Sequence, residues 1–279
     1  MQLLKKFSLL FISILLFAYY YQYSSIKEPY IEASAAILMD AQSGEILYSK
    51  NQNLPLAPAS MSKMMTMYLV LEQIHYGTLN WDDLVIIGPN AVNSIGVKIE
   101  VQAGDLLTVR DLFYAMVISS ANNAAVALAE HITKDEETFT DLMNEKARKL
   151  HLTDTTHFVN ATGLPNAENV ESKMSALDLA MLAQHLLKTY PEVLDVTKQT
   201  SYTLTNGTSV HPTNKMLYAS ELQFKGIDGL KTGFTDEAGY CFTGTAKIDN
   251  RRLISVIIGT DEDTKRFIET KKLFSYGFQ

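Results

Sequence analysis

Apolar and polar residues alternate with two different periods along the chain, and these periods separate strand regions from helix regions. Short apolar runs at residues 35–40 and 45–48, on either side of a turn-forming stretch that ends in Gly44, predict a β-hairpin. A helical pattern then begins near Ser60 and ends at Gly77. Its apolar positions are Met61, Met64, Met65, Tyr68, Leu69 and Leu71. We therefore expect a hairpin followed by a buried helix.

The rest of the chain changes from helical to strand character after Pro191. Helices are expected at residues 112–116, 124–131, 139–150 and 176–187, and the helical pattern as a whole runs from about Thr108 to Thr189. Strands are expected at 201–205, 240–246 and 252–258, before a closing helix at 263–274. The last strands are predicted to rejoin the first hairpin in one sheet. This gives an α/β (α+β) fold, an antiparallel sheet flanked by helices, with an inserted all-helical subdomain at about 78–190 and a cleft between them.

Composition narrows the classes of function. The chain has 279 residues, 47% of them hydrophobic and 20% charged, which is typical of a globular protein. Its net charge of −7, without a basic run, argues against a nucleic-acid partner. The six histidines lack metal-ligand spacing, so neither a metal nor another cofactor is expected. Cys241 is the only cysteine, and we expect it to be buried in a strand.

The N-terminal segment differs from everything after it. Lys5 and Lys6 precede an apolar core at residues 7–18, as in an export signal. The nearest pair of small residues suited to cleavage, Ala33 and Ala35, lies well beyond this core and leads into the first strand. Residues 1–30 are therefore predicted to be a signal segment that remains as a membrane anchor, with cleavage and secretion as the alternative, and residues 31–279 to form one extracytoplasmic domain.

Three short motifs carry the candidate chemistry. They are Ser60 with Lys63, Ser120 with Asn122, and Lys231-Thr232-Gly233. Taken singly, the first two are weak signals, because Ser24 with Lys27 and Ser49 with Asn51 match the same patterns. Lys-Thr-Gly occurs only once, and all three stand in the order found in penicillin-binding proteins and serine β-lactamases. Order and context therefore make acyl transfer the leading hypothesis.

The first motif fits nucleophilic catalysis. If a helix begins at Ser60, its hydroxyl and the Lys63 amine lie one turn apart on the same face. A lysine acts as a base only when neutral, so its usual pKa of about 10.4 must fall. Burial and a second cation both lower such a pKa, and Lys231 is the expected second cation.

The other two motifs suit binding and proton transfer. The N–H of Phe234 is a candidate oxyanion donor, and Gly233 is expected to leave room for an extended substrate. The structural alternative for Gly233 is a strand bend. Ser120 is a candidate proton relay to the leaving amine, and the Asn122 amide a candidate partner for a substrate carbonyl. The structural alternative is helix capping by Ser119 or Ser120.

Longer blocks strengthen the assignment. Over about residues 35–278, with blocks at 37–44, 58–66, 157–164 and 229–240, the sequence resembles low-molecular-mass penicillin-binding proteins of the D-alanyl-D-alanine carboxypeptidase type. The resemblance implies a β-lactamase/transpeptidase-like fold, peptidoglycan stem peptides as substrates and covalent inhibition by β-lactam antibiotics. It implies Ser60 as acylated nucleophile, Lys63 as base, Ser120 and Asn122 as the second pair, Lys231 and Thr232 as carboxylate and carbonyl binders, and Arg266 as a further carboxylate ligand.

The chain departs from the family pattern at two places. Many relatives continue into a β-rich domain and a C-terminal amphipathic helix, whereas this sequence stops at Gln279, so membrane attachment is expected at the other end. Phe234 stands where several relatives carry a polar residue, and this difference is expected to affect rate or substrate preference. Two alternatives stay open: a serine β-lactamase, with Glu168 or Glu171 activating water, and a non-catalytic wall-binding protein with a dormant site.

Overall fold

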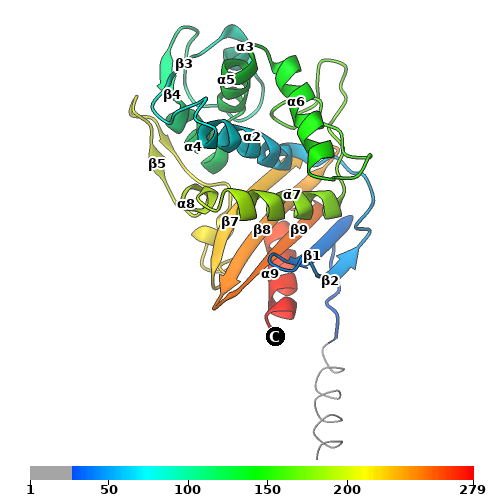
Figure 1. Cartoon of the computed structure of the whole chain (residues 1–279). Helices are drawn as coiled ribbons and strands as arrows, with labels where there is room; N and C mark the ends of the chain where they lie inside the picture. The colour runs from blue at the N-terminus through cyan, green and yellow to red at the C-terminus, as the bar shows by residue number, and fades with distance from the viewer. Residues whose placement is uncertain (1–26) are drawn as a thin grey trace, which may run out of the picture.

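A five-stranded antiparallel sheet organises the protein (Figure 1). The computed structural model describes residues 27–279. The order across the sheet is β2-β1-β9-β8-β7, with β1 at Ala35–Asp40, β2 at Ile46–Lys50, β7 at Ile227–Thr235, β8 at Gly239–Ile248 and β9 at Arg251–Thr260. The first hairpin and the last strands thus share one sheet, as predicted. Strand β7 forms one edge of this sheet.

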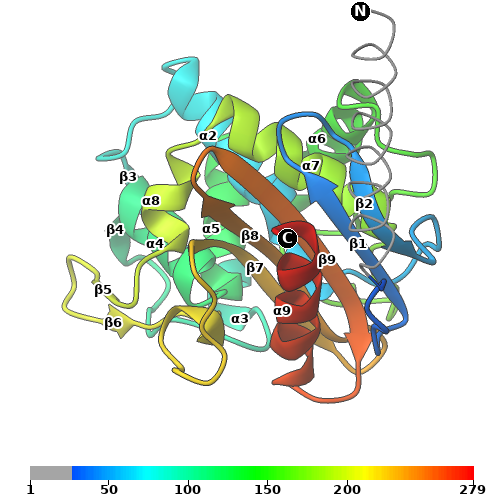
Figure 2. The same ribbon diagram turned by 90° about the horizontal axis from the view of Figure 1, so that it is seen from below.

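Helices cover both faces of the sheet. Figure 2 shows α9 (Lys265–Gly277) on one face and α7 (Ala176–Thr189) on the other. Helix α8 (Val193–Thr197) lies beside α7 and contacts β7. Beyond α7 lies a helical layer of α2 (Lys63–His75), α3 (Pro89–Asn93), α4 (Val109–Ile118), α5 (Asn122–Thr133) and α6 (Glu136–Lys149). Helix α2 is at the centre of this layer and is buried from Lys63 to Glu72, which explains its nearly uninterrupted apolar sequence.

The local sequence explains where the main elements begin and end. The central strand β9 is buried on both faces, and its run Leu253–Ile258 is accordingly almost all apolar rather than alternating. The side chain of Ser175 accepts the Asp178 N–H at the start of α7, and Asp135 does the same for Thr138 at the start of α6. Cys241 is buried in β8, as predicted.

Two sequence predictions about strands are wrong. The inserted region is not all helical, because β3 (Leu84–Ile86) pairs with β4 (Leu106–Thr108) in a small separate sheet. Leu84 and Ile86 are apolar although they are exposed, so β3 lacks the alternation of apolar and polar residues that marks a half-buried strand. The strand expected at 201–205 is shortened to β5 (Tyr202–Thr203), which pairs with β6 (Ser209–Val210) outside the main sheet.

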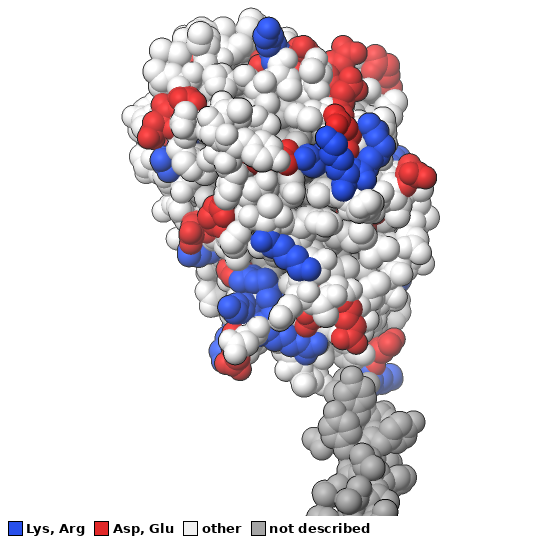
Figure 3. Space-filling model, in the orientation of Figure 1, with Lys and Arg blue, Asp and Glu red and all other residues white. Residues whose placement is uncertain are grey.

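The predicted membrane anchor at residues 1–30 falls almost wholly outside the described residues. From residue 27 onward, no helix is both long enough and apolar enough to cross a bilayer. The anchor therefore stays a prediction. On the face of the described part of the chain in Figure 3, basic and acidic side chains lie side by side.

Candidate active site

Ser60 and Lys63 meet at the entry to helix α2. The chain enters this helix through a 3₁₀ turn, η1 (Ala59–Ser62), rather than through the α-helical start that the sequence predicts. A 3₁₀ turn eclipses side chains three residues apart. The Lys63 Nζ accordingly lies 3.0 Å from the Ser60 Oγ. The expected juxtaposition is present, produced by the tighter turn.

Lys63 is completely buried, with three acceptors around its amine. Besides Ser60, its Nζ lies 2.6 Å from Asn122 Oδ1 and 2.8 Å from the Thr162 carbonyl. Burial first, and the charge of Lys231 second, hold the pKa of Lys63 well below its usual value. A neutral amine has two N–H bonds and one lone pair. The two N–H bonds suit Asn122 and Thr162, which leaves the lone pair facing the Ser60 hydroxyl.

Thr162 belongs to a turn whose role the sequence did not reveal. Asn160 organises this turn, because its Oδ1 accepts the N–H groups of Thr162 at 3.0 Å and Gly163 at 2.8 Å. Gly163 has a φ of +78°, and a Cβ there would overlap the Ala59 carbonyl next to Ser60. The turn therefore packs directly on η1. The block at 157–164 was recognised as a family feature, but a main-chain acceptor has no side-chain signal.

Ser120 and Asn122 come from the junction between α4 and α5. Ser119 closes α4 and its Oγ donates to the Ala115 carbonyl, whereas the N-cap of α5 is Ala121, without a side-chain hydrogen bond. Ser120 therefore caps neither helix. It has a φ of +66°, and its hydroxyl makes no hydrogen bond within residues 27–279. The Asn122 Nδ2 donates to the Ile95 carbonyl at 2.7 Å, so part of the amide predicted to bind substrate is held by the protein.

Strand β7 brings the third motif against η1. Lys231 is 1% exposed, and burial together with the charge of Arg266 lowers its pKa to about 7. A Cβ on Gly233 would lie 2.8 Å from the Pro58 carbonyl and 3.2 Å from the Ser60 nitrogen. The need for glycine thus comes from close packing on the nucleophile's turn, whereas the sequence suggested space for substrate. Because β7 is an edge strand, some of its main-chain groups have no strand partner and can bind a substrate. The Phe234 N–H stays the predicted oxyanion donor.

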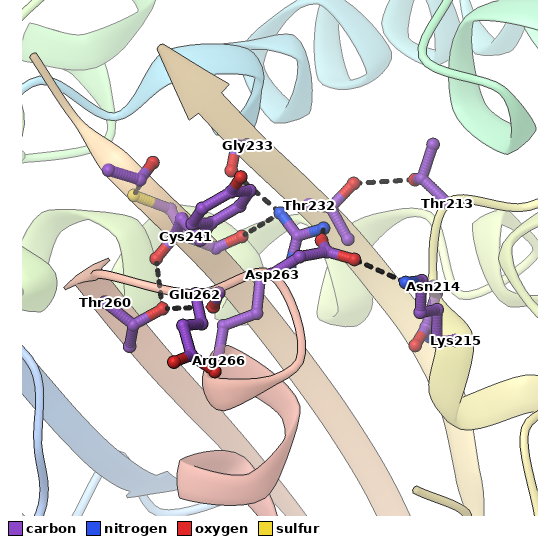
Figure 4. Close-up of polar contacts among 12 residues, drawn as sticks. Thr213, Asn214, Lys215, Thr232, Gly233, Cys241, Thr260, Glu262, Asp263 and Arg266 are labelled. Atoms are coloured by element: carbon purple, nitrogen blue, oxygen red, sulfur yellow. Dashed lines mark hydrogen bonds and ion pairs between the residues drawn. The ribbon is translucent and has the colours of Figure 1, made fainter. Parts of the chain in front are cut away.

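Thr232 on β7 and Arg266 on α9 both have polar contacts next to Gly233 (Figure 4). The Thr232 hydroxyl pairs with that of Thr213 at 2.6 Å. Arg266 donates to the Gly233 carbonyl at 3.0 Å and forms an ion pair with Asp263, while its buried Nε has no partner within residues 27–279. Arg266 therefore braces β7. A direct contact with a substrate carboxylate stays a prediction.

A cavity of about 650 Å³ joins these elements. From the predicted set it is lined by Ser60, Ser120, Asn122, Thr232, Gly233, Phe234 and Arg266. Lys63 and Lys231 lie behind this lining as buried side chains. The Phe234 ring is 46% exposed and packs on Tyr240 at 4.3 Å between centroids. Within the described chain, no group of three or more acidic, histidine or cysteine side chains is placed to hold a metal.

The glutamates considered for water activation lie apart from the lysine. Glu171 lines the cavity, and its carboxylate accepts the Thr235 hydroxyl at 2.9 Å, two positions beyond Gly233 on β7. Glu168 is exposed and lines a neighbouring cavity. The charged groups that shift the pKa of Lys63 are Lys231, which lowers it, and Glu136, which raises it.

Comparisons with known proteins agree on one family. The model of a family described as D-alanyl-D-alanine carboxypeptidase matches residues 22–262. The chain is 36% identical over 256 residues to D-alanyl-D-alanine carboxypeptidase DacF of Bacillus subtilis, with 88% of this chain and 62% of the relative covered. It is 34% identical over 261 residues to DacC of Escherichia coli, covering 91% and 63%. The chain thus spans less than two thirds of the length of these relatives.

Solved structures match the fold. Penicillin-binding protein D2 from Listeria monocytogenes, in its ampicillin-bound form, superposes with a TM-score of 0.79 at 36% identity, covering 91% of this chain and all of the other. A peptidoglycan synthesis regulatory factor from Streptococcus pneumoniae gives a TM-score of 0.84 at 36% identity, covering 89% and 74%. The predicted combination of antiparallel sheet and helices is therefore the fold of penicillin-binding proteins.

Proposed function

The chain belongs to the D-alanyl-D-alanine carboxypeptidase family, and from this we propose that it is a serine peptidase that removes the terminal D-alanine from peptidoglycan stem pentapeptides. In this proposal β-lactam antibiotics acylate the same serine. The reaction requires neither metal nor cofactor. The observation that carries the proposal is the contact between the buried Lys63 amine and the Ser60 hydroxyl at 3.0 Å, at a cavity that β7 borders.

Acylation uses this contact. The neutral Lys63 amine takes the proton of the Ser60 hydroxyl as its oxygen attacks the carbonyl carbon of the penultimate D-alanine. The oxyanion that forms accepts the N–H groups of Ser60 and Phe234, and Lys231 and Thr232 bind the terminal carboxylate. The C–N bond then breaks, and the leaving amine receives a proton from the Lys63 ammonium through the Ser120 hydroxyl. The products are free D-alanine and an ester on Ser60.

Deacylation repeats these steps with water. Lys63, neutral again, takes one proton from a water molecule, whose oxygen attacks the ester carbonyl. The Ser60 oxygen leaves with the proton that Lys63 held, and the shortened stem peptide departs as a carboxylic acid. Because Glu168 and Glu171 make no hydrogen bond to Ser60 or Lys63 in the described chain, rapid hydrolysis of a bulky penicilloyl ester is not expected.

Two measurements on the intact protein test the proposal. Incubation with a D-alanyl-D-alanine stem-peptide mimic should release free D-alanine catalytically. Intact mass after exposure to penicillin should increase by one penicilloyl group, on Ser60. A protein that forms no adduct under conditions that label a known relative, and releases no D-alanine, would instead be the dormant wall-binding protein. An adduct that clears within seconds would support the β-lactamase alternative.

The site of action follows from the substrate. Peptidoglycan lies outside the cytoplasmic membrane, so the enzyme is proposed to act there, tethered by the N-terminal segment. Fractionation of cells that make the full chain, compared with a version whose residues 1–26 are replaced by a cleavable export signal, tests this. Only the full chain should remain with the membrane after a wash in high salt.

The two buried lysines predict a bell-shaped pH profile. Acylation requires neutral Lys63, so its rate rises as the pH rises through the depressed pKa of Lys63. Binding of a carboxylate requires charged Lys231, whose pKa is about 7, so the rate falls again above that pH. The second-order rate constant of acylation by a carboxylate-bearing penicillin, measured from pH 4 to 10, checks this. The methyl ester of the same penicillin should lack the alkaline fall; an alkaline fall shared by both compounds would contradict the role of Lys231.

A further inference from the structure

The turn that holds the Lys63 amine is itself held by a glutamate from a different helix. Glu136 is the first residue of α6, and its Oε1 accepts the Ala161 N–H at 3.0 Å. On the same turn, the Ala161 carbonyl accepts the Thr66 hydroxyl at 2.8 Å. The next carbonyl, that of Thr162, is the one that binds Lys63 Nζ. A single peptide unit, that between Ala161 and Thr162, thus separates the N–H that Glu136 binds from the carbonyl that binds the amine.

Glu136 is also close enough to act on Lys63 through charge. The negative charge of Glu136 raises the pKa of Lys63, opposing the larger effects of burial and of Lys231. Burial raises the pKa of Glu136, and the Ala161 N–H and the Lys63 charge lower it. The charge of Glu130, on α5, also raises the pKa of Glu136.

The arrangement around Lys63 leaves Glu136 as its only acidic neighbour among the described residues. The amine faces Ser60 on η1, Asn122 on α5 and the Thr162 carbonyl, all uncharged, with Lys231 on β7 as the second cation. When Lys63 takes up a proton during the reaction, it and Lys231 become two buried cations, which is costly because each disfavours the charge of the other. A carboxylate placed behind the turn offsets part of this cost without touching the nucleophile.

We propose that Glu136 is a positioning residue for Lys63: its carboxylate fixes the turn that presents the Thr162 carbonyl, and its charge acts on the Lys63 amine through that turn. This inference rests on the proposed function, since it concerns the base of the same reaction. Glu136 contacts neither the Ser60 hydroxyl nor the cavity that Ser60 lines. Instead it lines the adjacent cavity, on the far side of Leu164 and Pro165.

Two substitutions separate the hydrogen bond from the charge. Glu136→Gln keeps an oxygen acceptor for the Ala161 N–H and removes the charge. Glu136→Ala removes both. Glu137→Gln is the matched control, because Glu137 is the next residue of the same helix, carries the same charge and is exposed, and its carboxylate makes no hydrogen bond within the described residues. The readout is the rate constant of acylation by a fluorescent penicillin as a function of pH.

In Glu136→Gln the acid limb of this profile should move to lower pH by about one unit, because loss of a negative neighbour disfavours the lysine's charged form. The plateau should stay within about three-fold of wild type. Glu136→Ala should show the same displacement, and its plateau should fall about ten-fold or more as the turn loosens. The alkaline limb, which follows Lys231, should stay in place in both. Glu137→Gln should superimpose on wild type.

Three results would overturn the inference. They are a Glu136→Gln profile that superimposes on wild type, an acid limb displaced to higher pH, or an equal displacement in Glu137→Gln. Thermal unfolding of each variant shows whether a lowered plateau reflects lost folding, and the position of the limb does not depend on the amount of folded enzyme. A wild-type protein that no penicillin acylates at any pH would contradict the proposed function instead.

Discussion

Replacing Lys63 by methionine is expected to reduce acylation of Ser60 by about 10³-fold or more, because the attacking hydroxyl loses its base. Methionine is unbranched like lysine, is one atom shorter and is apolar, so it suits a buried site. The change leaves Asn122 Oδ1 and the Thr162 carbonyl without their donor, at a cost of about 1–3 kcal/mol each. The substitution also removes the free-energy cost of burying the Lys63 amine. Folding should therefore survive while the chemistry is lost.

The measurement is the second-order rate constant of acylation, with circular dichroism and thermal unfolding of the same preparations. Ser60→Ala supplies the baseline, since it has no hydroxyl to acylate. Lys198→Met supplies the matched control, because Lys198 is exposed and pairs with Asp195 by an ion pair on the surface. It should acylate like wild type. A folded Lys63→Met protein that acylates within ten-fold of wild type would show that another group is the base.

The sequence predicted those parts of the site that depend on local spacing. Ser60 and Lys63 are three residues apart, so any helical turn brings their side chains together. The turn is a 3₁₀ helix where the sequence predicts an α-helix, but the contact between the two side chains is the same. Burial of Lys63 follows from the apolar residues that surround it on α2. The order of the motifs and the blocks around them carried the family assignment.

The remaining parts depend on contacts between distant segments, which the sequence does not encode locally. The Thr162 carbonyl binds Lys63 across 99 positions, and a carbonyl is common to every residue. Gly233 was singled out for substrate space, but its neighbour is the Ser60 turn, and only the packing of β7 on η1 shows this. Glu136 precedes the helix expected at 139–150, and only the structure shows that it is the first residue of α6 and reaches the turn at Ala161.

Gly163 lies where the turn that contains Thr162 packs on η1. Substituting Gly163 should have the second-largest effect on acylation. In Gly163→Ala the new Cβ would overlap the Ala59 carbonyl and lie 2.8 Å from the Ser62 Oγ, at a φ of +78° that disfavours any side chain. Relief requires η1 to move away from the turn. The free energy of unfolding is expected to fall by about 3–5 kcal/mol, and the melting temperature by about 10 °C. Acylation should fall about 10²-fold, because a shift of about 1 Å between nucleophile and base suffices for that.

Substitutions at two other glycines separate the effects of backbone strain and lost stability from the effect of displacing the Gly163 turn. Gly77 has a φ of +72° with nothing near its would-be Cβ, so Gly77→Ala reports backbone strain alone, about 1 kcal/mol. Gly226 has a φ of +82° and an overlap with the Lys247 carbonyl as severe as that of Gly163, but it precedes β7 and lies outside the cavity lining. Gly226→Ala should therefore lower the melting temperature as much as Gly163→Ala and leave acylation of the folded enzyme within about three-fold of wild type. If both variants lose acylation equally, the loss measures general instability and the Gly163 turn does not position Lys63.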